Sequence, residues 1–300
     1  MRRTKLSALA RSITLVASVA APCLAQAADL LPPLPPEPLP PPVEIGGGWY
    51  LRGDVGVGAT SIDKISTVVP HGYLPDGYRY DQKSVSDSFF AGGGVGYQFG
   101  SYFHGDVTAE YRGGTKLKFQ DSFNSTCFSK THNEEGQHDA YDCKGVNAYG
   151  ASLSSIVVMA NGYFDLGTWY GVTPFIGGGV GTAFHRLSGF SDSGYGAATG
   201  GYGYAKDKNT NTFAWAAMAG LGYSVTPNLK LEVGYRYLNL GHVGTNPVTC
   251  INDPDCGGAV YKVKDITSHD VRIGMRWLLG GGVIAPVAEY REPAPLVRKY

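Results

Sequence analysis

The chain has 300 residues with 25 acidic and 25 basic side chains, so its charge gives no indication of a nucleic-acid partner. Glycine accounts for 43 residues, which disfavours a helical bundle because each interior glycine costs a helix about 1 kcal/mol relative to alanine. An apolar content of 43% excludes a disordered chain, and no apolar run is long enough for a membrane-spanning helix.

Residues 1–27 have the pattern of a secretory signal peptide. Basic residues lie within the first five positions, a mostly apolar stretch runs from Ile13 to Leu24, and Ala25-Gln26-Ala27 has the small-x-small form of a cleavage site. Cleavage after Ala27 removes four basic residues and no acidic ones, which leaves 21 bases against 25 acids. Pro22 stands before Cys23 where a lipoprotein signal needs a small residue, so we expect no lipid there.

Two segments flank the predicted folded part. Residues 28–48 include eight prolines between Pro32 and Pro42, a composition typical of an extended polyproline II spacer. Residues 280–300 form a second tail with scattered prolines and mixed charges. We predict that both are periplasmic and that residues 49–279 form the domain.

Period-2 alternation dominates residues 49–279. From Leu229 to Tyr237 the apolar side chains share one face, and Lys230, Glu232, Gly234 and Arg236 share the other. The same pattern predicts strands over 49–59, 103–112 and 271–279. Weaker strands, whose second face is glycine, alanine and serine, are predicted over 88–99, 149–164, 170–184 and 212–224. For 149–164 the pattern does not decide which face points inward.

The connections between these eight strands alternate strictly between short and long. An up-and-down barrel places alternate connections at opposite ends, and outer-membrane barrels have short periplasmic turns and long external loops. The sequence therefore predicts an all-β fold, an eight-stranded antiparallel up-and-down transmembrane β-barrel. A soluble lipocalin-type barrel, with the apolar face inside, is the alternative.

Three features favour the membrane barrel. The apolar face carries aromatic residues near strand ends, namely Trp49, Tyr111, Tyr237 and Trp277. The connections differ in length between the two ends of the barrel. The last strand reads Arg272-x-Gly274-x-x-Trp277-x-Leu279, which resembles the signal that barrel-assembly machinery recognises on final strands, and we assign that role to Gly274, Trp277 and Leu279.

Several short motifs resemble one family in their order along the chain. They are Ala28-Asp29-Leu30, Trp49-Tyr50-x-Arg52-Gly53, the run from Gly171 to Gly177, and the run from Leu231 to Tyr237. The mature chain is similar to the small outer-membrane surface antigens of alphaproteobacteria, often called the porin family, which are related to opacity proteins and the OmpA transmembrane domain. The resemblance implies an eight-stranded barrel in the outer membrane and implies no enzyme.

The polar face of the strands predicts a charged lumen. Its members are Arg52, Asp54, Asp106, Glu110, Arg112, Lys230, Glu232, Arg236, Arg272 and Arg276. An eight-stranded barrel is only wide enough for side chains to fill it, so a plug of paired charges is the favoured interpretation and a narrow ion path the alternative. We expect Glu232 to face Arg236 and the Arg272/Arg276 pair, and we expect the glycine runs 92–96 and 177–181 to leave room for the arginines.

Four cysteines remain after cleavage, and export to an oxidising compartment favours two disulfides. Three pairings are open, of which the pairing of near neighbours, Cys127–Cys143 and Cys250–Cys256, is favoured. A zinc site is the alternative, but the spacing fits no common zinc motif.

Other polar groups suggest little chemistry. His132, Glu134, Glu135, His138 and Asp139 lie in one loop, and their spacing matches no defined metal or haem site. Residues 252–255, within the Cys250–Cys256 segment, supply only two carboxylates, too few for calcium. Ser268 and Asp270 face opposite His269 on a strand, so the three cannot converge as a hydrolase triad. We expect no cofactor, no metal and no enzymatic activity.

These observations predict a structural, surface-exposed barrel exported by the general secretory route to the outer membrane of a Gram-negative bacterium. The expected partners are outer-membrane lipid, lipopolysaccharide, the barrel-assembly machinery and host or environmental surfaces, but not nucleic acid. A small-solute porin and a haem or metal-binding surface receptor are the alternative functions.

Overall fold

The computed structural model describes residues 48–70, 72, 74–132, 137–251 and 258–280. The predicted signal peptide, tether and tail lie almost entirely outside these residues and stay predictions. Within the described part, every regular element is a strand, and no helix is long and apolar enough to cross a membrane.

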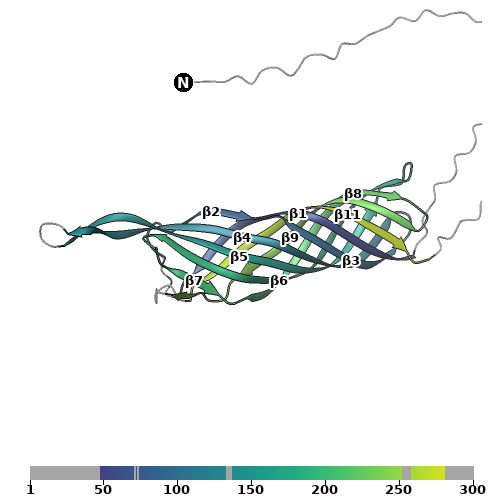
Figure 1. Cartoon of the computed structure of the whole chain (residues 1–300). Coiled ribbons are helices and arrows are strands. Elements are labelled where there is room, and N and C mark those ends of the chain that lie inside the picture. Colours follow the sequence, from purple (N-terminus) through teal and green to yellow (C-terminus); the bar gives the residue numbers. More distant parts are fainter. Residues whose placement is uncertain (1–47, 71, 73, 133–136, 252–257, 281–300) are drawn as a thin grey trace, which may run out of the picture. The chain divides into compact units, whose positions relative to one another are not determined.

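Eight long antiparallel strands form a closed ring (Figure 1). In ring order they are β1 (Gly48–Val68), β3 (Ser88–Gln98), β4 (Phe103–His132), β5 (His138–Asp165), β6 (Val172–Gly196), β8 (Lys208–Ser224), β9 (Leu229–Gly244) and β11 (Val260–Leu278). The first and last strands pair from Tyr50–Leu278 to Val68–Val260, which closes the ring. Three short strands, β2 (Arg79–Val85), β7 (Tyr202–Ala205) and β10 (Thr249–Ile251), extend the sheet at one end. The all-β eight-stranded prediction is confirmed.

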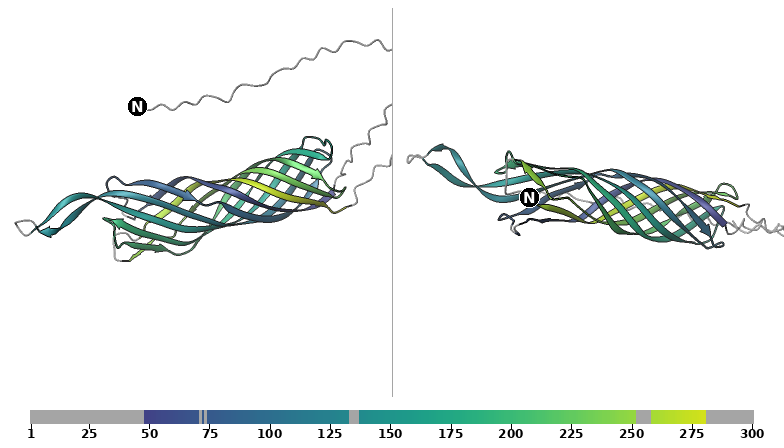
Figure 2. Two further views of the ribbon diagram at one scale, coloured as in Figure 1. Left: turned by 45° about the horizontal axis from the view of Figure 1, so that its top comes forward. Right: turned by 90° about the horizontal axis from the view of Figure 1, so that it is seen from below.

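Three short turns gather at the opposite end of the ring from these extra strands (Figure 2). They join β3 to β4, β5 to β6 and β8 to β9. Gly100 and Gly171 adopt positive φ angles of 121° and 82° in two of them, a conformation that a residue with a Cβ rarely takes.

Apolar side chains cover the outside of the ring. Leu51, Val55, Val233 and Ile273 are each 50–60% exposed, as expected for side chains that face lipid in the membrane. Aromatic residues mark the two edges of this belt. Trp49 contacts Tyr97 at the short-turn edge, and Trp215 contacts Tyr237 at the other. For residues 149–164, the odd-numbered side chains from Tyr149 to Tyr163 point inward.

Most strands extend well beyond the predicted ends. The segment predicted to end at Arg112 continues as β4 to His132, and β5 begins at His138 rather than at Tyr149. In five strands the alternation is interrupted by a bulge, where two successive side chains both point away from the interior. The bulges lie at 63–64 in β1, 113–114 in β4, 188–189 in β6, 241–242 in β9 and 264–265 in β11. Each such bulge exchanges inward and outward positions, so a strict period-2 pattern ends there although the strand does not.

These bulges divide the barrel into a membrane ring and an outer extension. At this level Ile62 of β1 pairs with Ile266 of the neighbouring strand β11. Below this level lies the apolar outer belt. Above it, outward residues such as Lys64, Lys262 and Lys264 are charged and exposed, so the outer extension faces water.

We predict that an acidic side chain at the Trp277 position impairs assembly. Trp277 is 53% exposed at the belt edge, where a carboxylate facing lipid costs less than about 1 kcal/mol, so the larger expected effect is loss of the predicted insertion signal. Trp277→Asp should therefore lower the fraction of protein that shows heat-modifiable gel mobility. Lys262→Asp is the matched control, because Lys262 faces outward on the same strand above the belt. Equal yields of folded protein from both variants would contradict the lipid-facing assignment.

Candidate functional site

The ten predicted lumen charges all lie in the barrel interior. Nine are among the buried residues, and the side chain of Asp54 is 9% exposed. Two further acids, Asp270 and Asp165, are fully buried with them. These two, with the four predicted acids, balance the six predicted bases. The alternation already placed Asp270 on the face shared with Arg272, but the predicted strand began one residue later.

The inner charge cluster lies toward the short-turn end and centres on Arg52. Its guanidinium contacts Asp54 at 2.6 Å, Asp106 at 3.2 Å and Glu232 at 2.9 Å. Glu232 also contacts Arg276 at 3.2 Å. The expectation that Glu232 faces Arg236 is therefore wrong. Glu232 and Arg236 share a strand face, but residues four apart on a strand lie about 13 Å from each other. Glu232 therefore pairs with arginines on other strands.

The outer charge cluster joins β4, β9 and β11 through two arginines. Arg112 donates to both oxygens of Asp270 at 2.8 Å and to Ser268 Oγ at 2.8 Å. Arg236 donates to Asp270 at 2.7 Å and to Glu110 at 2.8 Å. Both guanidinium groups also lie over the ring of Phe90, at 4.8 and 4.9 Å from its centre.

Aromatic rings separate the charged groups in the inner cluster as well. Arg52 and Arg272 lie over the Tyr163 ring at 5.3 and 5.8 Å, and Arg276 lies over Tyr50 at 5.2 Å. Such cation–π contacts hold a guanidinium where water is scarce. Tyr50, Phe90 and Tyr163 were not among the residues predicted to lie in the lumen. The inward parity of β1 could have identified Tyr50, whereas the face of Tyr163 was undecided.

Glycines give these side chains room, although not as expected. A Cβ at Gly58 would overlap Arg112 and Asp270, so that position tolerates only glycine without rearrangement. In the runs 92–96 and 177–181, however, the side chains that occupy the space of a Cβ belong to Glu110, Thr108, Tyr50, Tyr163 and Asn161, so the expected clearance for arginines is wrong. The arginines need space at Gly58 and Gly234 instead.

An apolar layer lies above the outer charge cluster. Its buried members come from seven of the eight ring strands and include Ile62, Leu117, Leu153, Leu187, Leu238, Leu240 and Ile266. The expectation of a charged or small inward face along every strand was therefore incomplete. Above the bulges the interior follows the rule of a water-soluble core, in which apolar side chains point inward.

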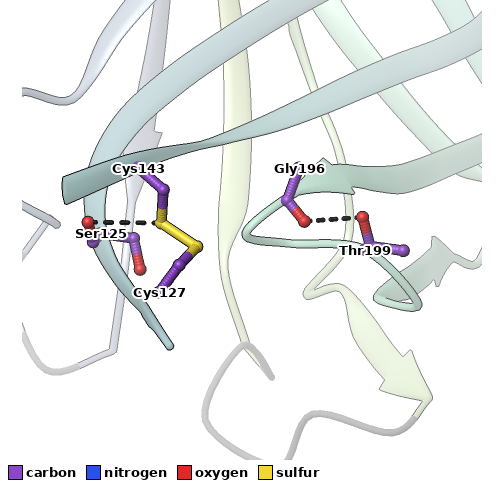
Figure 3. The surroundings of a disulfide bond; sticks show 5 residues. All are labelled: Ser125, Cys127, Cys143, Gly196 and Thr199. Carbon is purple, nitrogen blue, oxygen red and sulfur yellow. Dashed lines mark hydrogen bonds between the residues drawn. A yellow bond between two sulfur atoms is a disulfide. The ribbon is translucent and has the colours of Figure 1, made fainter. Parts of the chain in front are cut away.

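A disulfide joins Cys127 to Cys143 across the β4–β5 hairpin, with Cα atoms 5.8 Å apart (Figure 3). This is the near-neighbour pair that the spacing favours. Cys250 is also disulfide-bonded. Its predicted partner Cys256 lies outside the described residues. Next to the first disulfide, Ala197 N donates to Lys144 O at 3.0 Å, which attaches the β6–β7 turn to the hairpin.

The other candidate residues form no catalytic or metal-binding group in the described part of the chain. Ser268 and Asp270 point into the lumen and bond to each other at 2.6 Å, whereas His269 points outward and bonds the Tyr235 hydroxyl at 2.6 Å. No three potential metal ligands gather among the described residues. Glu134, Glu135 and residues 252–255 lie outside them.

Comparison with known proteins assigns the family. The model of the outer membrane protein β-barrel domain matches residues 13–274, and the chain belongs to that family. It is therefore an outer-membrane β-barrel protein of a Gram-negative bacterium, as the sequence predicted.

Individual relatives include surface proteins. An uncharacterized protein of Brucella abortus is 33% identical over 88% of this chain and 94% of its own length. The outer membrane protein PagN of Salmonella typhimurium is 25% identical over 65% of this chain and 76% of its own. A putative adhesin of Rickettsia prowazekii is 24% identical over 78% and 88%. Among solved structures, Neisserial surface protein A superposes with a TM-score of 0.42 at 15% identity, covering 78% of this chain and 99% of that protein.

We predict that loss of the Glu232 carboxylate destabilises the barrel, because Arg52 and Arg276 would lose a buried partner. Glu232→Gln should lower the free energy of unfolding by about 3 kcal/mol, measured by thermal melting in detergent. Glu232→Gln with Arg276→Gln should recover part of that loss, since Arg52 keeps Asp54 and Asp106.

Asp207→Asn is the matched control for this experiment. Asp207 forms an exposed ion pair with Arg186 at 3.0 Å, and such pairs contribute only about 0–1 kcal/mol. If Glu232→Gln melts like Asp207→Asn, water already screens the lumen charges and the interior is not a dry, paired network.

Proposed function

We propose that this protein is a structural surface barrel whose lumen is closed and whose outer extension makes contacts outside the cell. The observation that carries the closed lumen is the succession of three filled layers along the barrel. The inner charge cluster, the outer charge cluster and the apolar layer each occupy the interior with buried side chains. A narrow ion path would have to pass through all three.

The outer extension supports the contact role. Its β4–β5 hairpin projects beyond the neighbouring strands (Figure 1). Phe128 and Tyr141 on this hairpin are 64% and 54% exposed, and Tyr195 on the adjacent β6 is 57% exposed. Exposed aromatic side chains are common anchors in protein interfaces. One relative carries the description putative adhesin, which agrees with such a role.

Electrical recording tests the closed lumen. Refolded protein in a planar bilayer should give no discrete conductance steps, while a porin reconstituted in the same membrane does. Reproducible steps that depend on the protein, and whose ion selectivity changes in Glu110→Gln, would show that ions pass through the outer charge cluster and that the porin alternative is correct.

Adhesion tests the contact role. Bacteria of a non-adherent strain that display this chain should bind cultured host cells, and Phe128→Ser with Tyr141→Ser should reduce binding several-fold. Tyr170→Ser is the control, since Tyr170 is fully exposed in a turn at the opposite end of the barrel. Equal binding by both variants, at equal surface levels, would remove the hairpin from the contact surface.

A further inference from the structure

A cavity of about 760 Å³ lies in the outer extension, above the apolar layer. Its walls come from strands β1, β4, β5, β6, β7 and β11 and from the segments around Pro70, Pro75 and Val248. Part of its rim is exposed to solvent at Pro70, Thr199 and Gly200. We call this cavity the outer chamber. The lumen charges do not reach it, because the apolar layer lies between them.

Stacked aromatic rings lie beneath and around the outer chamber. The rings of Phe119 and Tyr149 stack with their centres 4.5 Å apart, and Tyr149 and Tyr261 are 4.7 Å apart. Phe190 stacks on Tyr261 at 5.4 Å. Tyr149 and Tyr261 line the chamber, together with Tyr78. The chamber therefore has aromatic side chains in its wall.

A buried carboxylate makes these rings electron-rich. Asp121 is fully buried and accepts hydrogen bonds from the hydroxyls of Tyr78 at 2.8 Å and Tyr149 at 2.6 Å. The Tyr261 hydroxyl donates in turn to that of Tyr149 at 2.9 Å. Donation to a carboxylate shifts electron density onto the donor, and a chain of such bonds passes the effect along. Both effects strengthen the attraction of a ring face for a cation.

Asp192 lines the chamber beside Tyr149 and has no cationic partner among the described lining residues. Its Oδ1 atom is buried without a hydrogen bond, and it pairs across the sheet with Tyr149. No lysine, arginine or histidine is among the described residues that line the chamber. Burial, and secondarily the nearby Asp121 charge, raises the pKa of the Asp192 carboxyl to about 7. The other titratable groups that line the chamber are tyrosines, namely Tyr78, Tyr149, Tyr202 and Tyr261, and Asp121 accepts hydrogen bonds from two of them.

Charge and shape together select the class of ligand. An anion would meet the Asp192 carboxylate and no cation. A divalent metal ion needs several oxygen ligands, and only one free carboxylate is available here. A neutral apolar molecule would leave Asp192 unpaired. An organic cation would pair with the Asp192 carboxylate and also contact the aromatic rings in the wall.

We propose that the outer chamber binds a small organic ammonium ion, which lies against the rings of Tyr149 and Tyr261 and pairs with the Asp192 carboxylate. This site is separate from the closed lumen and from the hairpin contacts, so it stands whether or not those proposals hold.

Choline binding tests the proposal, measured by titration calorimetry on the full chain in a detergent without a choline headgroup. Choline should bind saturably, and 3,3-dimethylbutan-1-ol, its uncharged analogue of equal shape, should bind at least about tenfold more weakly. Equal binding of the two compounds would show an apolar cavity without charge recognition. Absence of saturable choline binding would overturn the proposal.

Asp192→Asn supplies the decisive variant, because it keeps the shape of the side chain and removes its charge. Choline affinity should fall about tenfold or more, while Asp207→Asn, an exposed carboxylate on the outer extension, should bind as the parent does. Tyr261→Phe should weaken binding only slightly because the ring remains and only its hydroxyl bond is lost, and Tyr261→Leu should abolish it. Unchanged binding in Asp192→Asn would overturn the proposal.

The pH dependence and melting separate a binding role from a structural one. Because the pKa of Asp192 is raised, its charged form destabilises the empty chamber, so that stability is lost as pH rises through about 7. Asp192→Asn should therefore melt no lower than the parent at about pH 8. Choline should bind the parent on the order of tenfold more tightly at about pH 8 than at about pH 5.5, and the variant equally at both. A variant that melts lower, or an equal pH dependence in both, would contradict the assignment.

Discussion

Closure of the ring between β1 and β11 is the constraint on which the rest of the structure depends. Inside a bilayer there is no water to satisfy a free strand edge, so a sheet can cross only when its first and last strands pair. Eight strands then set the width of the interior to roughly one layer of side chains across. Inward side chains must fill that width along the whole barrel, because eight paired strands fix the diameter of the ring and leave no open edge.

The two charge clusters fill the interior in a way that also specifies the strand arrangement. Arg112 bonds Asp270 across 158 residues of sequence, and Arg52 bonds Asp106 and Glu232 on two other strands. A slip of one residue in any of these pairings would turn a buried charge toward lipid and leave its partner unpaired. Replacing buried ion pairs with apolar groups is often neutral for stability. These contacts therefore specify the strand register, and aromatic rings lie against the arginines of both clusters.

The alternation of residues was sufficient to predict the membrane ring, because lipid outside and a polar interior impose a strict period of two. It identified all ten charges as inward, yet it could not identify their partners. Those contacts cross the barrel, and their geometry depends on strand tilt and stagger, which no local pattern contains. It also failed where strands bulge. Gly114, with φ of 80°, shifts the inward face of β4 from even to odd positions, so Leu117 and Phe119 did not extend the pattern that ends at Arg112.

The same bulges explain how one chain can face lipid at one level and water at another. They also explain why Asp121 and Asp192 point toward the interior near the outer chamber. Below them apolar side chains must face lipid, and above them apolar side chains must face inward, and the parity changes accordingly in β1, β4, β6, β9 and β11, whereas β5 and β8 keep one parity throughout. On β6 the inward residues are odd-numbered up to Leu187, and Gly189, with φ of 61°, makes Phe190 and Asp192 inward instead. Without the bulges at Gly114 and Gly189, Asp121 and Asp192 would point outward into water, where neither would approach Tyr149. The bulges between the two environments therefore position the residues of the chamber. Because of them, the aromatic side chains point inward above the core, and so do the carboxylates of Asp121 and Asp192.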